Sequence, residues 1–209
     1  INQRTMSSSS SSSPSTTTTT VVADRIRQAE ALKEEGNDLF RRGKIRKARV
    51  KYSTVFAYIK GLGSSSSSSS SSSGDDGGGM AGMASSVLGI DRPTVEEDRR
   101  IRELRISCES NIALCRFKLG DYESSIDSSD RVLAIDPDHA KSLYRKGAAL
   151  SRLDRDLETA RDCLRKAVDL DSGDDKSKSG GPAAKELARV RRKLRDREEE
   201  SRNKLAKAL

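Results

Sequence analysis

The sequence predicts an all-α fold, a solenoid of three helical hairpins followed by a C-terminal capping helix. Three observations support this fold class. Apolar residues recur at helical spacing through most of the chain outside its serine-rich stretches. Short turns containing glycine or Asp-Pro divide the helices into pairs. Equivalent positions recur 34 residues apart, as Ala113 and Gly147 do, and this is the length of one helix–turn–helix repeat.

Composition indicates that part of the chain stays outside the folded domain. Hydrophobic residues make up 33% of the 209 residues and tryptophan is absent, whereas a globular domain has roughly 45–50% apolar residues. The deficit lies mainly in runs of serine, threonine and glycine. Because such runs bury too little apolar surface to offset their ordering entropy, we predict a disordered leader at 1–23 and a disordered insertion at 61–93.

The first predicted hairpin covers residues 24–60. One apolar stripe runs through its first half and a second through its last half, and Arg42-Gly43-Lys44 separates them. The stripes consist of Ile26, Ala29, Leu32, Gly36, Leu39 and Phe40, and of Ile45, Ala48, Tyr52, Val55 and Ile59.

The remaining elements follow the insertion. Thr94 and Glu97 form a capping-box pattern that begins a second hairpin at 94–137, whose first helix is extended. A third hairpin is predicted at 138–171 and a polar linker at 172–181. A basic capping helix then occupies 182–209, with an apolar stripe of Leu187, Val190, Leu194 and Leu205.

Charge and cysteine usage narrow the class of protein. The chain has 40 basic and 32 acidic residues and a net charge of +8, which favours acidic partners without choosing among nucleic acid, membrane surface and acidic peptide. Its three cysteines form no Cys-x-x-Cys pair, which favours buried, reduced thiols in a cytoplasmic protein over a metal site or a disulfide. No apolar run reaches the roughly 18–20 residues of a membrane span.

The pattern of catalytic residue types does not favour an enzyme. The sequence shows no Ser/His/Asp set and no metal-ligand spacing, and its one histidine, His139, lies in a predicted turn. The glycine-rich stretch at 74–79 has no Lys-Ser/Thr after it, so it does not fit a phosphate-binding loop. We therefore expect no catalytic activity, no cofactor, no metal and no small-molecule substrate.

The repeated residues resemble the tetratricopeptide-repeat (TPR) family, whose hairpins stack into a right-handed solenoid. The resemblance covers 24–60 and 98–171, and it departs from the family pattern in three respects. The first two repeats are 77 residues apart rather than 34 (Gly36 to Ala113), Ser125 and Ser129 replace an alanine and an aromatic, and Asp154 replaces a turn glycine. The matching residues are Gly36, Phe40, Gly43, Ala48 and Tyr52, then Ala113, Phe117, Gly120, Tyr122, Ile126 and Asp136-Pro137, and then Leu143, Tyr144, Gly147 and Ala160.

Five polar residues are predicted to share the groove that the first helix of each repeat lines. Two pairs are spaced i, i+4 and therefore share a helix face, and Asn111 occupies the same repeat position as Arg145. Amide, ammonium and guanidinium donors suit the C-terminal carboxylate of a peptide and a nearby acidic side chain. The five residues are Lys33, Asn37, Asn111, Lys141 and Arg145.

This set resembles the carboxylate clamp of TPR co-chaperones, which grips the Glu-Glu-Val-Asp tails of the 90-kDa and 70-kDa heat-shock chaperones. The resemblance implies that Lys33, Asn37, Asn111 and Lys141 hold the terminal carboxylate and that Arg145 binds farther along the tail. An alternative is a generic TPR scaffold whose basic C-terminal helix contacts nucleic acid, a membrane surface or calmodulin. Between Lys185 and Leu209, interleaved acids and missing aromatics count against nucleic acid.

Overall fold

The computed structural model describes residues 17–62, 93–172 and 181–208. The predicted leader and insertion fall mostly outside these ranges. All regular elements within them are α-helices. The helices are α1 (Thr17–Arg41), α2 (Ile45–Ile59), α4 (Val95–Lys118), α5 (Tyr122–Ile135), α6 (Ala140–Leu153), α7 (Leu157–Ser172) and α8 (Pro182–Ala208).

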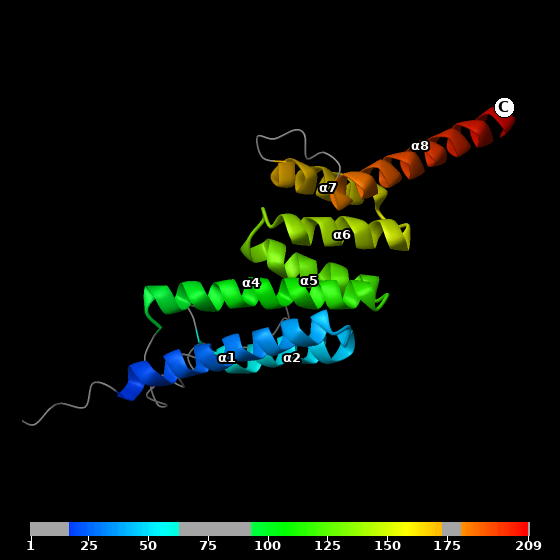
Figure 1. Ribbon diagram of the computed structural model, residues 1–209. Coiled ribbons are helices and arrows are strands. Elements are labelled where there is room, and N and C mark those ends of the chain that lie inside the picture. The colour runs from blue at the N-terminus through cyan, green and yellow to red at the C-terminus, as the bar shows by residue number, and fades with distance from the viewer. Residues whose placement is uncertain (1–16, 63–92, 173–180, 209) are drawn as a thin grey trace, which may run out of the picture.

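The helices stack in chain order as antiparallel pairs, α1 with α2, α4 with α5 and α6 with α7 (Figure 1). The first part of α8 packs on α7, and the remainder extends away from the stack. Each pair buries its facing stripes, as the spacing of apolar residues predicts. The predicted all-α solenoid of helical hairpins is therefore confirmed.

Close packing inside the first hairpin depends on Gly36. A β-carbon added there would lie 2.6 Å from Cε1 of Tyr52, well inside van der Waals contact. The tyrosine is 2% exposed, and its ring lies directly against the backbone of α1. This contact brings the Tyr52 hydroxyl to the side of α1 that carries Asn37.

The contact between α1 and α4 extends over the N-terminal halves of both helices. Val22 and Ile26 share a core cluster with Ile101 and Leu104. Because this burial favours helix before residue 24, α1 begins at Thr17, and the predicted border of the leader at residue 23 was wrong. The α1 residue Glu30 accepts hydrogen bonds of 2.7 and 2.8 Å from Nη2 of Arg100, an α4 residue, and this pair aligns the two helices.

Side-chain contacts hold the described residues on either side of 63–92 in place. Arg25 donates to the carbonyl oxygens of Tyr58, in the last turn of α2, and of Lys60, its C-cap residue, groups at a helix end that have no partner within the helix. Leu62 is fully buried, so the insertion predicted from residue 61 starts after it. At the other end, Thr94 and Glu97 form the predicted capping box.

The residues that depart from the family pattern have local partners. The hydroxyl of Ser125 donates to the carbonyl oxygen of Ala113 at 2.9 Å, and that of Ser129 donates to Ser125 at 2.9 Å. These bonds satisfy buried hydroxyl groups at positions where the family has apolar side chains. Asp154, at the position of a turn glycine, adopts a left-handed conformation with φ of 54°.

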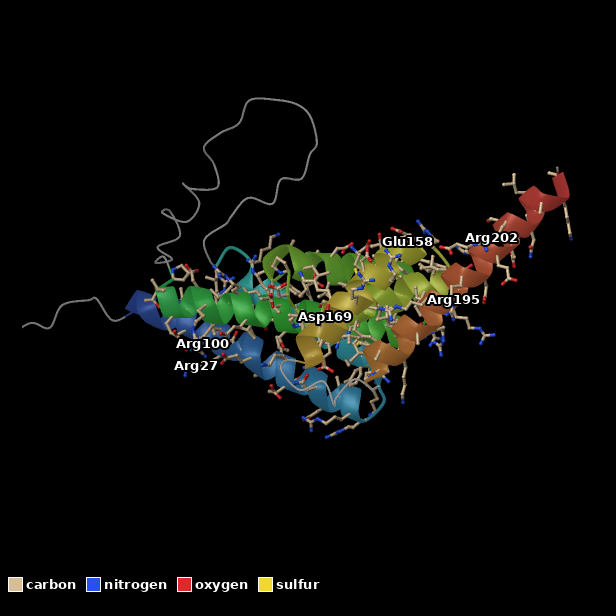
Figure 2. The ribbon with its side chains drawn as sticks, turned by 90° about the horizontal axis from the view of Figure 1, so that it is seen from above. Arg27, Arg100, Glu158, Asp169, Arg195 and Arg202 are labelled. Atoms are coloured by element: carbon tan, nitrogen blue, oxygen red, sulfur yellow. The ribbon has the colours of Figure 1, made fainter. Side chains whose placement is uncertain are left out.

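Only the first part of α8 acts as a cap. Ala183, Leu187 and Val190 are buried, whereas every described residue from 195 onward is exposed. Leu205 is 65% exposed, so its predicted place in the capping stripe was wrong. Figure 2 shows Arg195 and Arg202 on the projecting part of α8.

Candidate functional site

The predicted site residues all lie on α1, α4 and α6, the first helices of the three pairs. These helices contact each other in order, α1 with α4 and α4 with α6. They carry Lys33 and Asn37 on α1, Asn111 on α4, and Lys141 and Arg145 on α6. The stack therefore places the five residues on adjacent helices although residues 37 and 111 are separated by 74 positions.

Asn37 and Asn111 meet directly between α1 and α4. The amide nitrogen Nδ2 of Asn111 donates to Oδ1 of Asn37 over 3.4 Å. Both side chains line a pocket of about 230 Å³ together with Phe40, Tyr52 and Leu114, and Arg41 lies at the same pocket. The pocket thus combines two amides and a cation with an apolar wall.

The other contacts of Asn37 hold its side-chain amide at both the oxygen and the nitrogen end. Its Oδ1 accepts a hydrogen bond of 2.8 Å from the hydroxyl of Tyr52. Its Nδ2 donates to Oε2 of Glu34 at 3.1 Å, and Nζ of Lys33 lies 3.6 Å from Oε1 of the same carboxylate. Glu34 is therefore held by the two α1 residues of the predicted site.

Arg145 is a buried cation, 8% exposed. Its Nη1 donates to the carbonyl oxygen of Ser110 at 2.8 Å and also to the Ser110 hydroxyl. Among the described residues, none of its interactions is an ion pair with a carboxylate. Burial lowers the pKa of Arg145 to about 10, so the guanidinium remains charged at neutral pH and its charge is poorly compensated.

Lys141 lies one helical turn before Arg145 and is exposed. It borders a small pocket of about 110 Å³ between α6, α7 and α8 whose lining includes Tyr144, Asp171 and Pro182. Within the described ranges, no ion pair engages Lys141. Its ammonium group is therefore available to an anion.

The structure links the predicted residues to different extents. Asn37 and Asn111 are in contact, and Arg145 reaches the residue that immediately precedes Asn111. Lys33 lies one turn from Asn37 on the same helix, and no hydrogen bond or ion pair joins Lys141 to the other four residues. Two separate pockets hold three of the five residues, Asn37 and Asn111 in one and Lys141 in the other, so the described structure does not join the five in one closed cluster.

Sequence reasoning missed three residues that contact this set. Tyr52 was assigned only to the apolar stripe, and Ser110 and Glu34 were not considered as site residues. Proximity in the sequence is a signal for Glu34 and Ser110, because each is a neighbour of a site residue. No sequence signal indicates that the Tyr52 hydroxyl reaches Asn37, since that contact depends on how α2 packs on α1.

Other reactive groups do not form a second chemical site in the described part of the chain. Cys108 and Cys115 are buried, and burial raises their pKa values to about 12 and about 11. Among the described residues, no group of three or more His, Cys, Asp and Glu side chains could hold a metal ion. No helix in the described ranges is both long and apolar enough to cross a membrane.

Comparison with known proteins agrees with this architecture. A model of the tetratricopeptide repeat matches residues 110–139. The peptidyl-prolyl cis-trans isomerase FKBP4 of Mus musculus is 24% identical over 148 residues, which are 71% of this chain and 26% of that protein. The chain thus spans about a quarter of this relative, and the isomerase activity in the relative's name belongs to the longer protein.

Two solved structures share the fold. The C-terminal TPR-containing domain of a Plasmodium falciparum FK506-binding protein aligns with a TM-score of 0.63 and 23% identity, covering 85% of this chain and 95% of that domain. The first TPR of Spaghetti (RPAP3), bound to the HSP90 peptide SRMEEVD, aligns with a TM-score of 0.52 and 18% identity, covering 80% and 94%.

The stacked hairpins define a helical-repeat solenoid. One segment matches the tetratricopeptide-repeat model, and the arrangement of the hairpins is shared with a solved TPR-containing domain. The chain contains a match to the tetratricopeptide repeat at residues 110–139, and its fold is that of the TPR domains to which it is similar.

Proposed function

We propose that this chain binds the acidic C-terminal tail of a heat-shock chaperone of the 90-kDa or 70-kDa class, as a co-chaperone or adaptor. In this proposal Lys33, Asn37, Asn111 and Lys141 hold the terminal carboxylate, and Arg145 contacts an acidic side chain farther along the tail. No reaction is involved, because binding alone is the function.

The contact between Asn37 and Asn111 is the observation that carries the proposal. It places two amides from different repeats at one pocket, and an amide nitrogen can donate to a carboxylate while its oxygen is held by the protein. Lys33 lies one turn before Asn37 on α1 and contacts the same Glu34 carboxylate as Asn37 does. A peptide carboxylate is the ligand that this combination of neutral and cationic donors fits best.

Arg145 supports the proposal from the α6 side of the groove. A guanidinium that is buried without a carboxylate partner is costly, and an acidic side chain from a ligand would compensate its charge. Lys141, exposed one turn away, adds a second unpaired cation. An acidic peptide that crosses from α1 to α6 would therefore meet a donor on each of α1, α4 and α6.

The solved structures support the same ligand class. The RPAP3 domain, which has the same fold, is bound to the HSP90 peptide SRMEEVD, a sequence with two glutamates and a terminal aspartate. The binding free energy expected from these donors is also consistent with a peptide-binding site. Charge-assisted hydrogen bonds contribute roughly 1.5–3 kcal/mol each, and a few of them, less the ordering cost, give about −8 kcal/mol, which is micromolar affinity.

A variant comparison tests the proposal. Fluorescence anisotropy with a fluorescein-labelled SRMEEVD peptide would measure affinity for the wild type and for Lys33→Ala/Lys141→Ala. We expect affinity to fall at least tenfold, since the variant lacks two ammonium groups that donate to the peptide carboxylate. Arg42→Ala/Lys47→Ala is the matched control, because it also removes two positive charges, which lie at the turn after α1 and in the first turn of α2.

The control separates the groove from the general basic charge of the chain. The proposal holds if the groove variant loses affinity and the control variant keeps it. Equal losses of affinity in both variants would show that peptide binding depends on the net charge of the chain and not on the predicted site residues. An unchanged affinity in the groove variant would rule out the clamp.

The projecting end of α8 favours a second candidate function, a contact with nucleic acid, an anionic membrane surface or calmodulin. Residues 195–208 are exposed, although Arg197 among them pairs with Asp154, so most of this segment is accessible to a partner without unfolding of the stack. Deletion of 198–209 is expected to leave the melting temperature and tail affinity unchanged. If the deletion abolishes binding to duplex DNA, anionic vesicles or calmodulin, this second function is present.

A further inference from the structure

The orientation of the Asn37 amide decides whether it can hold a carboxylate. A carboxylate only accepts hydrogen bonds, so it requires the NH2 end of the amide and not the oxygen end. The two ends are nearly equal in size, and the groups around an amide decide which end faces which way. The neighbours of Asn37 therefore determine the chemistry that the groove presents.

Tyr52 lies where it can determine the orientation of the Asn37 amide. Its hydroxyl lies 2.8 Å from Oδ1 of Asn37, and the Nδ2 of Asn111 donates to the same oxygen at 3.4 Å. With Oδ1 occupied by two donors, Nδ2 of Asn37 is the end left for an acceptor. In the described structure that acceptor is the Glu34 carboxylate, at 3.1 Å.

The tyrosine is itself tightly constrained. It is 2% exposed, and Gly36 allows its ring to lie against α1 at a distance that no β-carbon would tolerate. Burial raises the pKa of Tyr52 to about 12, so the hydroxyl keeps its proton at every pH at which the protein would bind a partner. Tyr52 also lines the pocket that Asn37 and Asn111 share.

From this geometry we propose that Tyr52 is a positioning residue of the binding groove, which orients the Asn37 amide so that its NH2 group faces the terminal carboxylate of a peptide ligand. This inference rests on the proposed clamp function and adds a residue of α2 to it. Tyr52 does not touch the ligand carboxylate in this scheme. It acts through Asn37.

The test uses Tyr52→Phe, which removes the hydroxyl and keeps the ring. Affinity is measured for two forms of the labelled SRMEEVD peptide, one with a free C-terminal carboxylate and one with a C-terminal amide. We expect the variant to bind the free acid about fivefold more weakly and to bind the amide as the wild type does. The preference for the free acid, expressed as the ratio of the two dissociation constants, would then fall by the same factor.

Tyr58→Phe is the matched control on the same helix. Tyr58 is partly buried, and its hydroxyl makes no hydrogen bond among the described residues. Its removal is expected to leave both affinities unchanged. If Tyr52 acts only in stability, Tyr52→Phe would bind both peptides more weakly by the same factor, and the ratio of the two dissociation constants would not change. That result would overturn the proposal.

Asn37→Ala separates this inference from the proposed function. If Asn37→Ala lowers the preference for the free acid and Tyr52→Phe does not, the clamp stands and the positioning role of Tyr52 is overturned. If neither variant changes the preference, Asn37 does not bind the carboxylate and both proposals fail. If both variants lower it, Tyr52 acts through Asn37.

Discussion

Arg145 of α6 donates a hydrogen bond of 2.8 Å from Nη1 to the carbonyl oxygen of Ser110 in α4. This bond joins the second and third repeats at the residue next to Asn111. It leaves the positive charge of Arg145 without a carboxylate partner in the described part of the chain.

Replacing Arg145 should separate stability from binding. Methionine has a similar length and no charge, and an apolar residue at a buried ionic position is often neutral or stabilising. We expect Arg145→Met to leave the free energy of unfolding within about 1 kcal/mol of the wild type, while affinity for the acidic tail falls about tenfold or more. Urea denaturation and peptide titration measure the two effects. A large loss of stability with unchanged affinity would assign Arg145 a purely structural role.

Removing Glu34 should strengthen tail binding. Its carboxylate accepts from Nδ2 of Asn37 at 3.1 Å and lies 3.6 Å from Nζ of Lys33, so it engages two groups that the ligand needs. We expect Glu34→Ala to raise affinity about twofold to fivefold, the range for an exposed charge pair. Glu35→Ala is the control, because Glu35 pairs with Lys51 instead. Weaker binding by Glu34→Ala would show that the carboxylate supports the groove.

Stability should depend on pH through His139, which caps the N-terminus of α6. Its Nδ1 accepts from the backbone nitrogen of Ser142 at 3.2 Å, which requires a neutral ring. Burial lowers the pKa of His139 below its usual 6.5, and Arg145 and Lys141 act in the same direction, whereas Asp136 opposes them.

Because the folded-state pKa is lowered, the folded chain binds fewer protons than the unfolded chain in this range. The contribution of His139 to stability is therefore present above pH 6.5 and is lost as the pH falls through its folded-state pKa. His139 is the only histidine in the sequence. As the pH is lowered from about 7 to about 5.5, the melting temperature of the wild type should fall. The melting temperature of His139→Asn should change less, because asparagine keeps a cap acceptor at every pH. Parallel curves for the two proteins would contradict this.

Close packing of α6 on α7 should make Gly147 intolerant of a side chain. An added β-carbon would lie 2.6 Å from Cγ of Leu164 and 2.9 Å from the carbonyl oxygen of Ala160. Since backbone cannot move aside cheaply, we expect Gly147→Ala to cost about 1–3 kcal/mol despite the better helix propensity of alanine. Gly181→Ala is the control, where the nearest contact is 3.5 Å. Urea midpoints compare the two.

Much of the fold could be predicted because it depends on local patterns. The capping box of Thr94 and Glu97 is a short motif that forms as the sequence indicates. The spacing of 34 residues placed Asn111 and Arg145 at equivalent repeat positions, and the structure brings α6 to α4 through Arg145. The first helices of the repeats therefore lie side by side, as the predicted groove requires.

The remaining features depend on contacts between distant segments. Threonine is a weak helix former, so nothing local places the start of α1 at Thr17, and the burial of Val22 against α4 explains it. Leu205 fits the apolar spacing, but α8 has already passed beyond the stack. The hydroxyl of Tyr52 reaches Asn37 only because Gly36 permits close packing of α2 on α1.

Isothermal titration of the wild-type chain with two forms of one acidic peptide tests the central claim most directly. SRMEEVD with a free C-terminal carboxylate and SRMEEVD with a C-terminal amide share every side chain and differ only at the group that the groove is proposed to hold. We predict micromolar binding of the free acid and at least tenfold weaker binding of the amide. Equal affinities for the two peptides would contradict the carboxylate clamp.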